Sequence, residues 1–263
     1  MENIAKNINI LGAFCGKRDV PELTSEALRH AYGMERADVF VLFGGSILRG
    51  GEVLAEAMRR GIAKTYVIVG GEGHTTETLR RKMHQAFPEI ETEDLPEAEV
   101  FSRFLKHQYG LQPDFIECNS TNCGNNITNL LDLLRENEIS FKSIILSQDA
   151  TMQRRMEAGL RKYVGEDVTI INYPVYSARV VAENGELAYA EDIWGMWDMD
   201  RYISLLLGEI PRLSDDAGGY GPNGKGFIAH VDVPEKVRTA FNMLCEEHSQ
   251  LIREANPLYA SKT

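Results

Sequence analysis

The stretch DVFVLFGG, residues 38–45, is a continuous apolar run that ends in two glycines. The same pattern returns in KTYVIVGG, residues 64–71, and the intervening residues 50–63 carry apolar side chains at helical spacing. Continuous apolar runs are typical of strands that are buried on both faces of a parallel sheet. The two runs and their connecting helix therefore predict the start of an α/β fold.

Strand and helix patterns then alternate along the chain. Further strands are expected at 114–118, 141–148 and 168–174, and helices at 76–86, 93–110, 120–137 and 150–165. This alternation predicts a doubly wound, mainly parallel, Rossmann-like sheet with helices on both faces, over residues 38–175.

The two ends of the chain lack this alternation. Residues 1–37 are expected to form a helical segment of one or two short helices, the second beginning at Pro21. Residues 176–263 read as a C-terminal appendage of loop and helix packed on the core. Within this appendage, helices are expected at 197–213 and 234–255, with a Gly-rich loop at 214–226.

The composition limits the classes of partner. The 263 residues carry a net charge of −11, which argues against sequence-independent nucleic-acid binding and against an anionic membrane surface. No apolar window is long enough to cross a bilayer and the first residues lack the pattern of a signal peptide, so a cytoplasmic protein is expected. Reduced cysteines are expected, and no metal site is predicted, because nothing completes a zinc pattern with Cys118 and Cys123.

The loops that leave the strand ends are the places to look for a ligand site. Ligands of doubly wound sheets bind beyond the carboxyl ends of the strands, where strand order reverses. Glycines there let backbone groups approach a ligand, although paired glycines can also simply make a tight turn. The candidate ligand-binding residues are Gly44, Gly45, Ser46, Gly70, Gly71, Glu72, Gly73, His74, Glu97, Ser120, Thr121, Asn122, Asn126, Gln148, Asp149, Arg154 and Arg155.

Two of these residues are candidates for acid–base catalysis. His74 is the only histidine at a predicted strand end, although histidines in polar turns are commonly just exposed. Glu97 follows Asp94 by three residues, where a capping box places an acid, so a capping role competes with a functional one. The catalytic residues therefore stay open between these two candidates.

Polar residues crowd the start of the helix expected at 120–137. Ser120 or Thr121 can cap it, whereas Asn122 and Asn126 lie four residues apart and share one face. This crowding exceeds what a helix cap needs, which favours ligand contact for the two asparagines.

The helix expected at 150–165 can be capped by Asp149 and carries two adjacent arginines one turn in. One of Arg154 and Arg155 is expected to lie on a solvated face, and the other to hold a phosphate or carboxylate through two hydrogen bonds.

Two familiar nucleotide motifs are absent despite partial matches. GGEGHT resembles the dinucleotide fingerprint, but Thr76 stands at its third glycine position and the motif follows the second strand. GYGPNGKG resembles a phosphate-binding loop, but Gly226 replaces the Ser or Thr that follows the lysine. We interpret the second as a chance match.

The motifs STNCGNN, QDATMQRR and RYISLLLGEIPRL with DDAGGYGP resemble the YdcF branch of a bacterial family that also includes the SanA and ElyC envelope proteins. The resemblance covers residues 38–175 in the core and extends to about residue 233. The resemblance implies a Rossmann-like sheet, and it implies that Glu97, Glu117 and Arg154 occupy positions of the family pattern. The YdcF branch is similar to proteins described as binding S-adenosylmethionine, with no established reaction.

The chain departs from the family pattern at two positions. Asn125 stands where relatives usually have Glu, and Thr151 where they usually have His. If those residues perform acid–base chemistry in relatives, binding is more plausible here than hydrolysis.

Three functions follow from these patterns. The first is binding of S-adenosylmethionine or a related nucleotide-type ligand, with small-molecule transfer as a possible activity. The second is hydrolysis or transfer on a phosphate-bearing metabolite, and the third is a non-catalytic ligand sensor. The oligomeric state and the substrate stay open.

Overall fold

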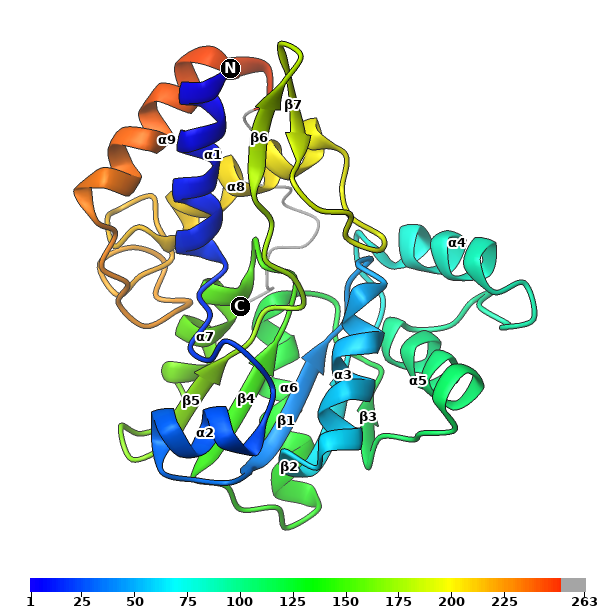
Figure 1. Cartoon of the computed structure of the whole chain (residues 1–263). Helices are drawn as coiled ribbons and strands as arrows, with labels where there is room; N and C mark the ends of the chain where they lie inside the picture. Colours follow the sequence, from blue (N-terminus) through cyan, green and yellow to red (C-terminus); the bar gives the residue numbers. More distant parts are fainter. Residues whose placement is uncertain (252–263) are drawn as a thin grey trace.

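Five parallel strands form the centre of the computed structural model, which describes residues 1–251 (Figure 1). Their order in the sheet is β3-β2-β1-β4-β5, with every neighbouring pair parallel. The predicted doubly wound α/β fold is therefore confirmed. The strands are β1 (Ala37–Phe43), β2 (Ala63–Val69), β3 (Phe115–Glu117), β4 (Ser143–Ser147) and β5 (Thr169–Asn172).

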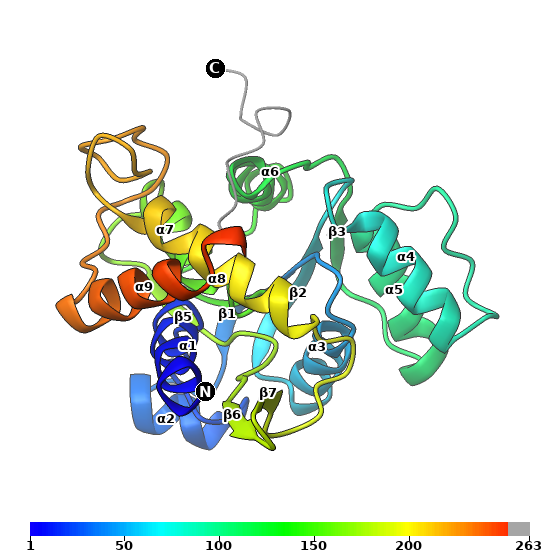
Figure 2. The same ribbon diagram turned by 90° about the horizontal axis from the view of Figure 1, so that it is seen from above.

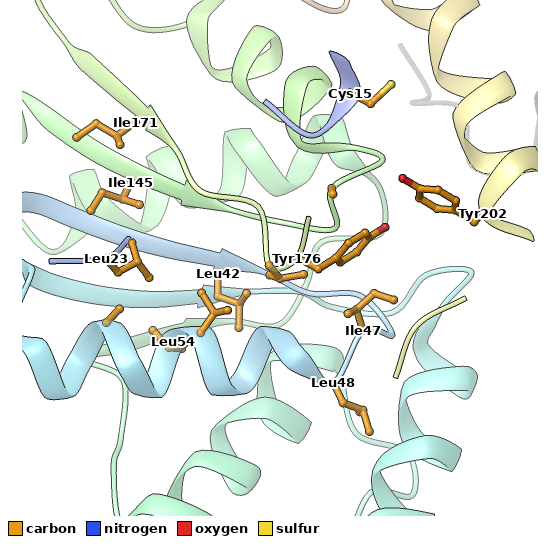
Figure 3. Close-up of a cluster of buried hydrophobic side chains, with 14 of the residues drawn as sticks. Cys15, Leu23, Leu42, Ile47, Leu48, Leu54, Ile145, Ile171, Tyr176 and Tyr202 are labelled. Atoms are coloured by element: carbon orange, nitrogen blue, oxygen red, sulfur yellow. The ribbon is translucent and has the colours of Figure 1, made fainter. Parts of the chain in front are cut away.

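Helices cover both faces of this sheet. On one face, Leu42 of β1 shares a core with Leu54 of α3 (Figure 3). On the other face, Val41 of β1 shares a core with Ile127 of α6 and Met156 of α7. Successive strand residues point to opposite faces, so burial on both sides requires the unbroken apolar runs of the sequence. The helices of the core are α2 (Ser25–Tyr32), α3 (Arg49–Arg60), α4 (Thr76–Ala86), α5 (Glu97–Tyr109), α6 (Cys123–Glu136) and α7 (Gln153–Arg161).

Strand order reverses at β1, which pairs with β2 on one side and β4 on the other. The chain moves outward from β1 through β2 to β3, then returns to place β4 on the opposite side. At the carboxyl end, Leu42 pairs with Ser147. The loops that follow β1 and β4 therefore flank the position where ligands of such sheets bind.

The two ends of the chain pack against each other. Helix α1 (Glu2–Cys15) contacts α8, α9 and β6, all from the last third of the chain (Figures 1 and 2). Residues buried near this junction include Cys15 and Tyr202, and the ring of Tyr202 lies 6.5 Å from that of Tyr176 (Figure 3). The C-terminal elements are β6 (Val180–Glu183), β7 (Glu186–Tyr189), α8 (Met199–Leu213), α9 (Glu235–Glu247) and the 3-10 turn Ser249–Leu251.

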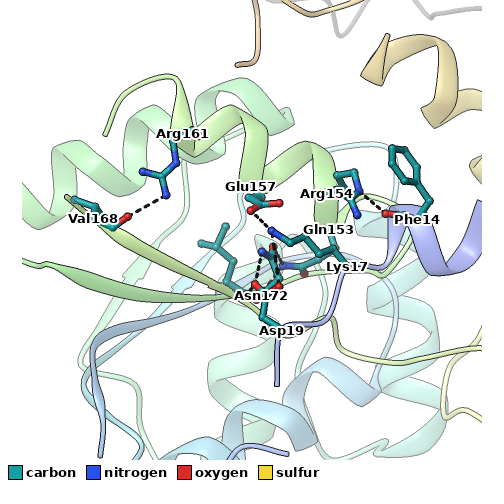
Figure 4. A network of polar contacts seen from close by, with 10 residues as sticks. Phe14, Lys17, Asp19, Gln153, Arg154, Glu157, Arg161, Val168 and Asn172 are labelled. Carbon is teal, nitrogen blue, oxygen red and sulfur yellow. Dashed lines mark hydrogen bonds and ion pairs between the residues drawn. The ribbon is translucent and has the colours of Figure 1, made fainter. Parts of the chain in front are cut away.

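A polar network ties the connection between α1 and α2 to the sheet (Figure 4). Asp19 accepts hydrogen bonds from the backbone and side-chain nitrogens of Asn172, at 2.7 and 2.8 Å. Gln153 donates to the Asn172 side chain at 2.9 Å. Lys17 pairs with Glu157 of α7 at 2.5 Å. The polar groups of Asn172, at the buried end of β5, thereby find hydrogen-bond partners in a segment from the N-terminus.

Two helices begin later than expected. Helix α2 starts at Ser25, because Thr24 caps it by accepting a hydrogen bond from the Ala27 backbone nitrogen at 3.1 Å, so the expected start at Pro21 is wrong. Helix α5 starts at Glu97 rather than near residue 93. Asp94 has a φ of 54°, which excludes it from the cap position the sequence suggested.

The next two boundaries also need correction. Asn122 caps α6, in place of the expected Ser120 or Thr121. Asp149 does not cap α7, which begins at Gln153, but accepts from the Thr151 backbone nitrogen in the preceding turn.

The C-terminal third differs from the sequence reading at two places. The hairpin of β6 and β7 was not predicted. Helix α9 ends at Glu247, before the expected residue 255, and residues 252–255 lie outside the described part of the chain. Among the helices of residues 1–251, none combines the length and apolar character that a membrane span requires.

Candidate functional site

The loops after the strands meet at the carboxyl edge of the sheet, as the sequence predicted. A Cβ atom on Gly70 would lie 3.1 Å from the Cα atom of Gly44, which brings the loops after β1 and β2 together. The Gly71 nitrogen donates to the Ser120 hydroxyl at 3.1 Å. A Cβ atom on Gly45 would lie 3.6 Å from the Gln148 side-chain oxygen. The four loops therefore form one continuous edge.

Close packing explains the paired glycines. A Cβ atom on Gly44 would lie 2.4 Å from the Glu97 Oε2 atom, and one on Gly71 would lie 2.2 Å from the Ser120 carbonyl oxygen. Gly45 has a φ of 154°, a conformation that side chains rarely adopt. Neighbouring protein atoms therefore require glycine at these positions, as expected if the paired glycines make tight turns. Glu97 occupies the space beside the first pair.

Glu97 is one of the buried acids of this edge, with an exposed fraction of 7%. Its Oε1 atom accepts hydrogen bonds from the Thr75 and Thr76 hydroxyls at 2.8 and 3.0 Å. Its backbone nitrogen donates to the Gly71 carbonyl at 3.0 Å, which fixes the start of α5. Burial raises the pKa of Glu97, while the two hydroxyls and the charge of Arg80 lower it by less.

This raised pKa makes stability depend on pH. As the pH rises, the unfolded chain loses the Glu97 proton near the ordinary pKa of 4.5, whereas the folded protein loses it at a higher pH. Wild-type stability therefore falls as pH rises from about 4.5 through the folded pKa. Glu97→Gln has no proton to lose, so it does not show this fall in stability. We expect the difference in free energy of unfolding, variant minus wild type, to be larger at pH 8 than at pH 4. Urea titrations across that range measure the difference, and an identical pH profile for both proteins would refute the expectation.

Two buried hydroxyls lie near the reversal point of the sheet. Ser46 follows β1 and is 1% exposed, and Ser147 ends β4 and is 0% exposed. Within residues 1–251, neither hydroxyl has a hydrogen-bond partner. A buried polar group without a partner costs about 1 to 3 kcal/mol, so a bound molecule that satisfies either hydroxyl gains that energy. We refer to Ser46, Ser147, Glu97 and Gln148 as the strand-end cluster.

A cover from the C-terminal third, which sequence reasoning missed, lies over this cluster. Lys82 of α4 donates to the Gly195 carbonyl at 2.6 Å and to the Ser46 carbonyl at 3.4 Å. Its Nζ atom lies 5.1 Å from the centre of the Trp197 ring. Burial lowers the pKa of Lys82. No local pattern marks Trp197, because its partners lie far away in the sequence.

Asp149, a predicted ligand residue, anchors this cover. Its Oδ1 atom accepts from the Thr151 nitrogen and hydroxyl at 2.9 and 2.8 Å, and from the Tyr176 hydroxyl at 2.7 Å. Its Oδ2 atom accepts from Trp197 Nε1 at 2.7 Å. Burial, together with the Asp149 charge, raises the pKa of Tyr176. Beside it, the Gln148 side chain accepts from the Asp149 nitrogen at 2.6 Å.

The two arginines donate to groups outside the strand-end cluster. Arg155 forms two hydrogen bonds with Glu209 of α8, at 2.6 and 2.9 Å. Arg154 donates to the Phe14 carbonyl, and its guanidinium carbon lies 4.2 Å from the centre of the Phe14 ring (Figure 4). Both arginines contact protein groups, so the expectation that one of them lies on a solvated face is wrong.

The asparagine-rich loop has a clear structural role. Asn122 accepts from the Gly124 and Asn125 nitrogens at 2.9 and 3.1 Å. Asn125 in turn accepts from the nitrogens of Thr121 and Asn122, which completes a capping box. A Glu at this third helical position would make the same reciprocal contact, so Asn125 serves the cap as a Glu would. Asn126 is half-buried and lies one turn further along the helix.

The remaining candidates lie on the outer part of the loop after β2. His74 is exposed, and Glu72 is exposed and pairs with Arg80 at 3.1 Å. Gly73 donates its backbone hydrogen to the Thr76 hydroxyl at 2.8 Å. Of the two acid–base candidates, only Glu97 is buried at the strand ends.

Among residues 1–251, no group of His, Cys, Asp and Glu side chains is arranged to hold a metal ion. No family model matches the chain.

Proposed function

We propose that the chain binds a small nucleotide-type ligand at the carboxyl ends of its strands, with S-adenosylmethionine as the first candidate. The observation that carries the proposal is Glu97, a buried carboxyl group beside Gly44 at the end of β1 and Gly70 at the end of β2. A buried acid at a strand end is a suitable acceptor for ribose hydroxyls or for an amine.

The rest of the strand-end cluster supports this ligand class. The hydroxyls of Ser46 and Ser147 have no hydrogen-bond partner within the described residues, and they offer both donors and acceptors. The motif resemblance to the YdcF branch points to the same ligand. A transferase activity would require a second substrate beneath the cover formed by Lys82 and Trp197.

The local charge favours this ligand over a phosphate-bearing one. The buried group at the strand ends is an acid, and an ionised Glu97 repels a phosphate. Arg154 and Arg155, the residues expected to hold a phosphate, instead lie outside the strand-end cluster, where they contact Phe14 and Glu209. Phosphoester turnover that is lost in Glu97→Gln would reverse this preference.

Calorimetry with S-adenosylmethionine and its demethylated product tests the proposal. We expect saturable binding of one or both, weakened about tenfold or more by Glu97→Gln, because a charge-assisted hydrogen bond contributes about 1.5 to 3 kcal/mol. Glu136→Gln is the control, since Glu136 is an exposed acid at the far end of α6 from the strand ends.

Native mass spectrometry of freshly purified protein provides a second measurement, through the mass of any copurified ligand. No heat with either compound, together with no bound adenosine-containing species, would contradict the proposal. Methyl transfer from the bound compound to an added acceptor would favour the transferase over the sensor.

A further inference from the structure

A groove of about 770 Å³ is lined by residues of α1, of β6 and of the start of α9. Helix α1 lies next to both other elements (Figure 1). None of the residues that line it belongs to the strand-end cluster. The lining face of α1 extends from Glu2 to Phe14, which corresponds to roughly 18 Å of helix. The volume lies in the range of about 300 to 1,000 Å³ that is usual for small-molecule sites.

The charge of this groove is opposite to that of the whole chain. The chain carries a net charge of −11, yet the groove has more cations than acids. None of its four cations forms an ion pair with a carboxylate of residues 1–251. The charged residues that line it are Lys6, Arg154, Arg179 and Lys236, with the acids Glu2 and Asp232. The groove therefore holds two net positive charges.

A cationic end of the groove lies beside the last turn of α1, at Arg154; Arg179 and Lys236 also line the groove, as does the acid Asp232. Arg154 rests on the ring of Phe14 and uses only its Nε atom for the Phe14 carbonyl (Figure 4). Lys236 lies in the first turn of α9, which has no side-chain cap and contributes the positive end of a helix dipole. Arg179 directly precedes β6. This strand is held to α1 because Asn9 exchanges two 2.7 Å hydrogen bonds with the backbone of Val180.

The rest of the groove mixes apolar and polar side chains. Ala5 and Ile10 of α1 and Val181 and Ala182 of β6 line it, together with Glu2, Lys6 and Asn9. A groove with a cationic end and apolar side chains suits a molecule with one anionic group and one apolar part.

We propose that this groove binds a small phosphate monoester, with its phosphate at Arg154, Arg179 and Lys236 and its apolar part along α1 and β6. A phosphate dianion neutralises the two net charges. The terminal nitrogens of an arginine form a planar fork that matches phosphate oxygens.

The test uses calorimetry at low salt with three probes: n-hexyl phosphate, inorganic phosphate and hexan-1-ol. We expect one saturable site for hexyl phosphate, at least tenfold tighter than for inorganic phosphate, and no saturable binding of hexan-1-ol. Binding should weaken as salt is raised, because the head group is held by charge.

The double variant Arg179→Gln/Lys236→Gln tests the position of the site. Neither side chain makes a hydrogen bond or ion pair within the described residues, so the fold should be retained. We expect at least tenfold weaker binding of hexyl phosphate, and no change in the equally charged control Lys106→Gln/Lys225→Gln, remote from the groove.

Equal affinities in the two double variants, equal binding of hexan-1-ol and hexyl phosphate, or no saturable binding would each overturn the proposal. The strand-end cluster is untouched by these variants, so its ligand is tested separately.

Discussion

Glu209→Leu is expected to lower the free energy of unfolding by about 3 to 5 kcal/mol, because it leaves the Arg155 guanidinium buried without its partner. The side chains of Arg155 and Glu209 are 13% and 5% exposed, so water cannot replace the lost carboxylate. For a chain of this size the loss corresponds to a fall in melting temperature on the order of 10 °C. Thermal and urea denaturation measure it.

The double variant Arg155→Met/Glu209→Leu separates an unpaired charge from lost packing. Replacing both members of a buried pair by apolar side chains is often neutral, so we expect most of the stability to return. Asp132→Asn is the control, because Arg135 and Asp132 form an exposed pair, with exposed fractions of 75% and 51%. Its effect should stay within about 0.5 kcal/mol. A Glu209→Leu effect as small as this control would contradict the expectation.

Gly71→Ala is expected to cost about 1 to 3 kcal/mol, since the new Cβ atom would lie 2.2 Å from the Ser120 carbonyl oxygen. The obstacle is backbone and cannot move aside as a side-chain end can. The Gly71 carbonyl also accepts from the Glu97 nitrogen, so a displaced loop should shift Glu97 and weaken ligand binding at the strand ends.

Gly73→Ala is the matched control on the same loop. Its Cβ atom would lie 3.4 Å from the Thr121 carbonyl oxygen, an ordinary contact. We expect unchanged or slightly higher stability, because alanine restricts the unfolded chain. Equal losses for the two variants, measured by urea denaturation and calorimetry, would show that the close approach at Gly71 is not what requires glycine there.

The sheet was predictable because its strands are buried on both faces. Val39 to Phe43 must be apolar at every position, so the run is visible without any structural context. The helix starts were less predictable, because Asp94 and Ser120 have the chemistry of a cap but not the backbone conformation or position. The hairpin of β6 and β7 did carry a local signal. Asn184 and Gly185, with φ of 51° and 84°, form the two-residue turn that favours this pair.

The edge of the site was predictable and its cover was not. Gly44 and Gly70 are placed by the rule that strand ends meet at one edge. Glu97 begins α5, and the sequence offered it only as a candidate for a cap, a ligand contact or acid–base catalysis, and through the family resemblance. Lys82 and Trp197 are in contact although more than a hundred residues separate them in the sequence, and this contact depends on how the C-terminal third folds back. The buried role of Arg155 was equally hidden, because two adjacent arginines on a helix have the same local pattern whether they face water or an acid.

The packing of α1 against α9 has a consequence for synthesis. Ile8 and Leu11 are fully buried in the finished protein, yet α9, which helps to cover α1, begins only at Glu235. At translation rates of about 5 to 20 residues per second, α1 waits roughly 10 to 40 s for that partner. During this interval the sheet can assemble while the first helix keeps an uncovered apolar face. Completion of the packing around α1 is therefore tied to the emergence of α9 from the ribosome.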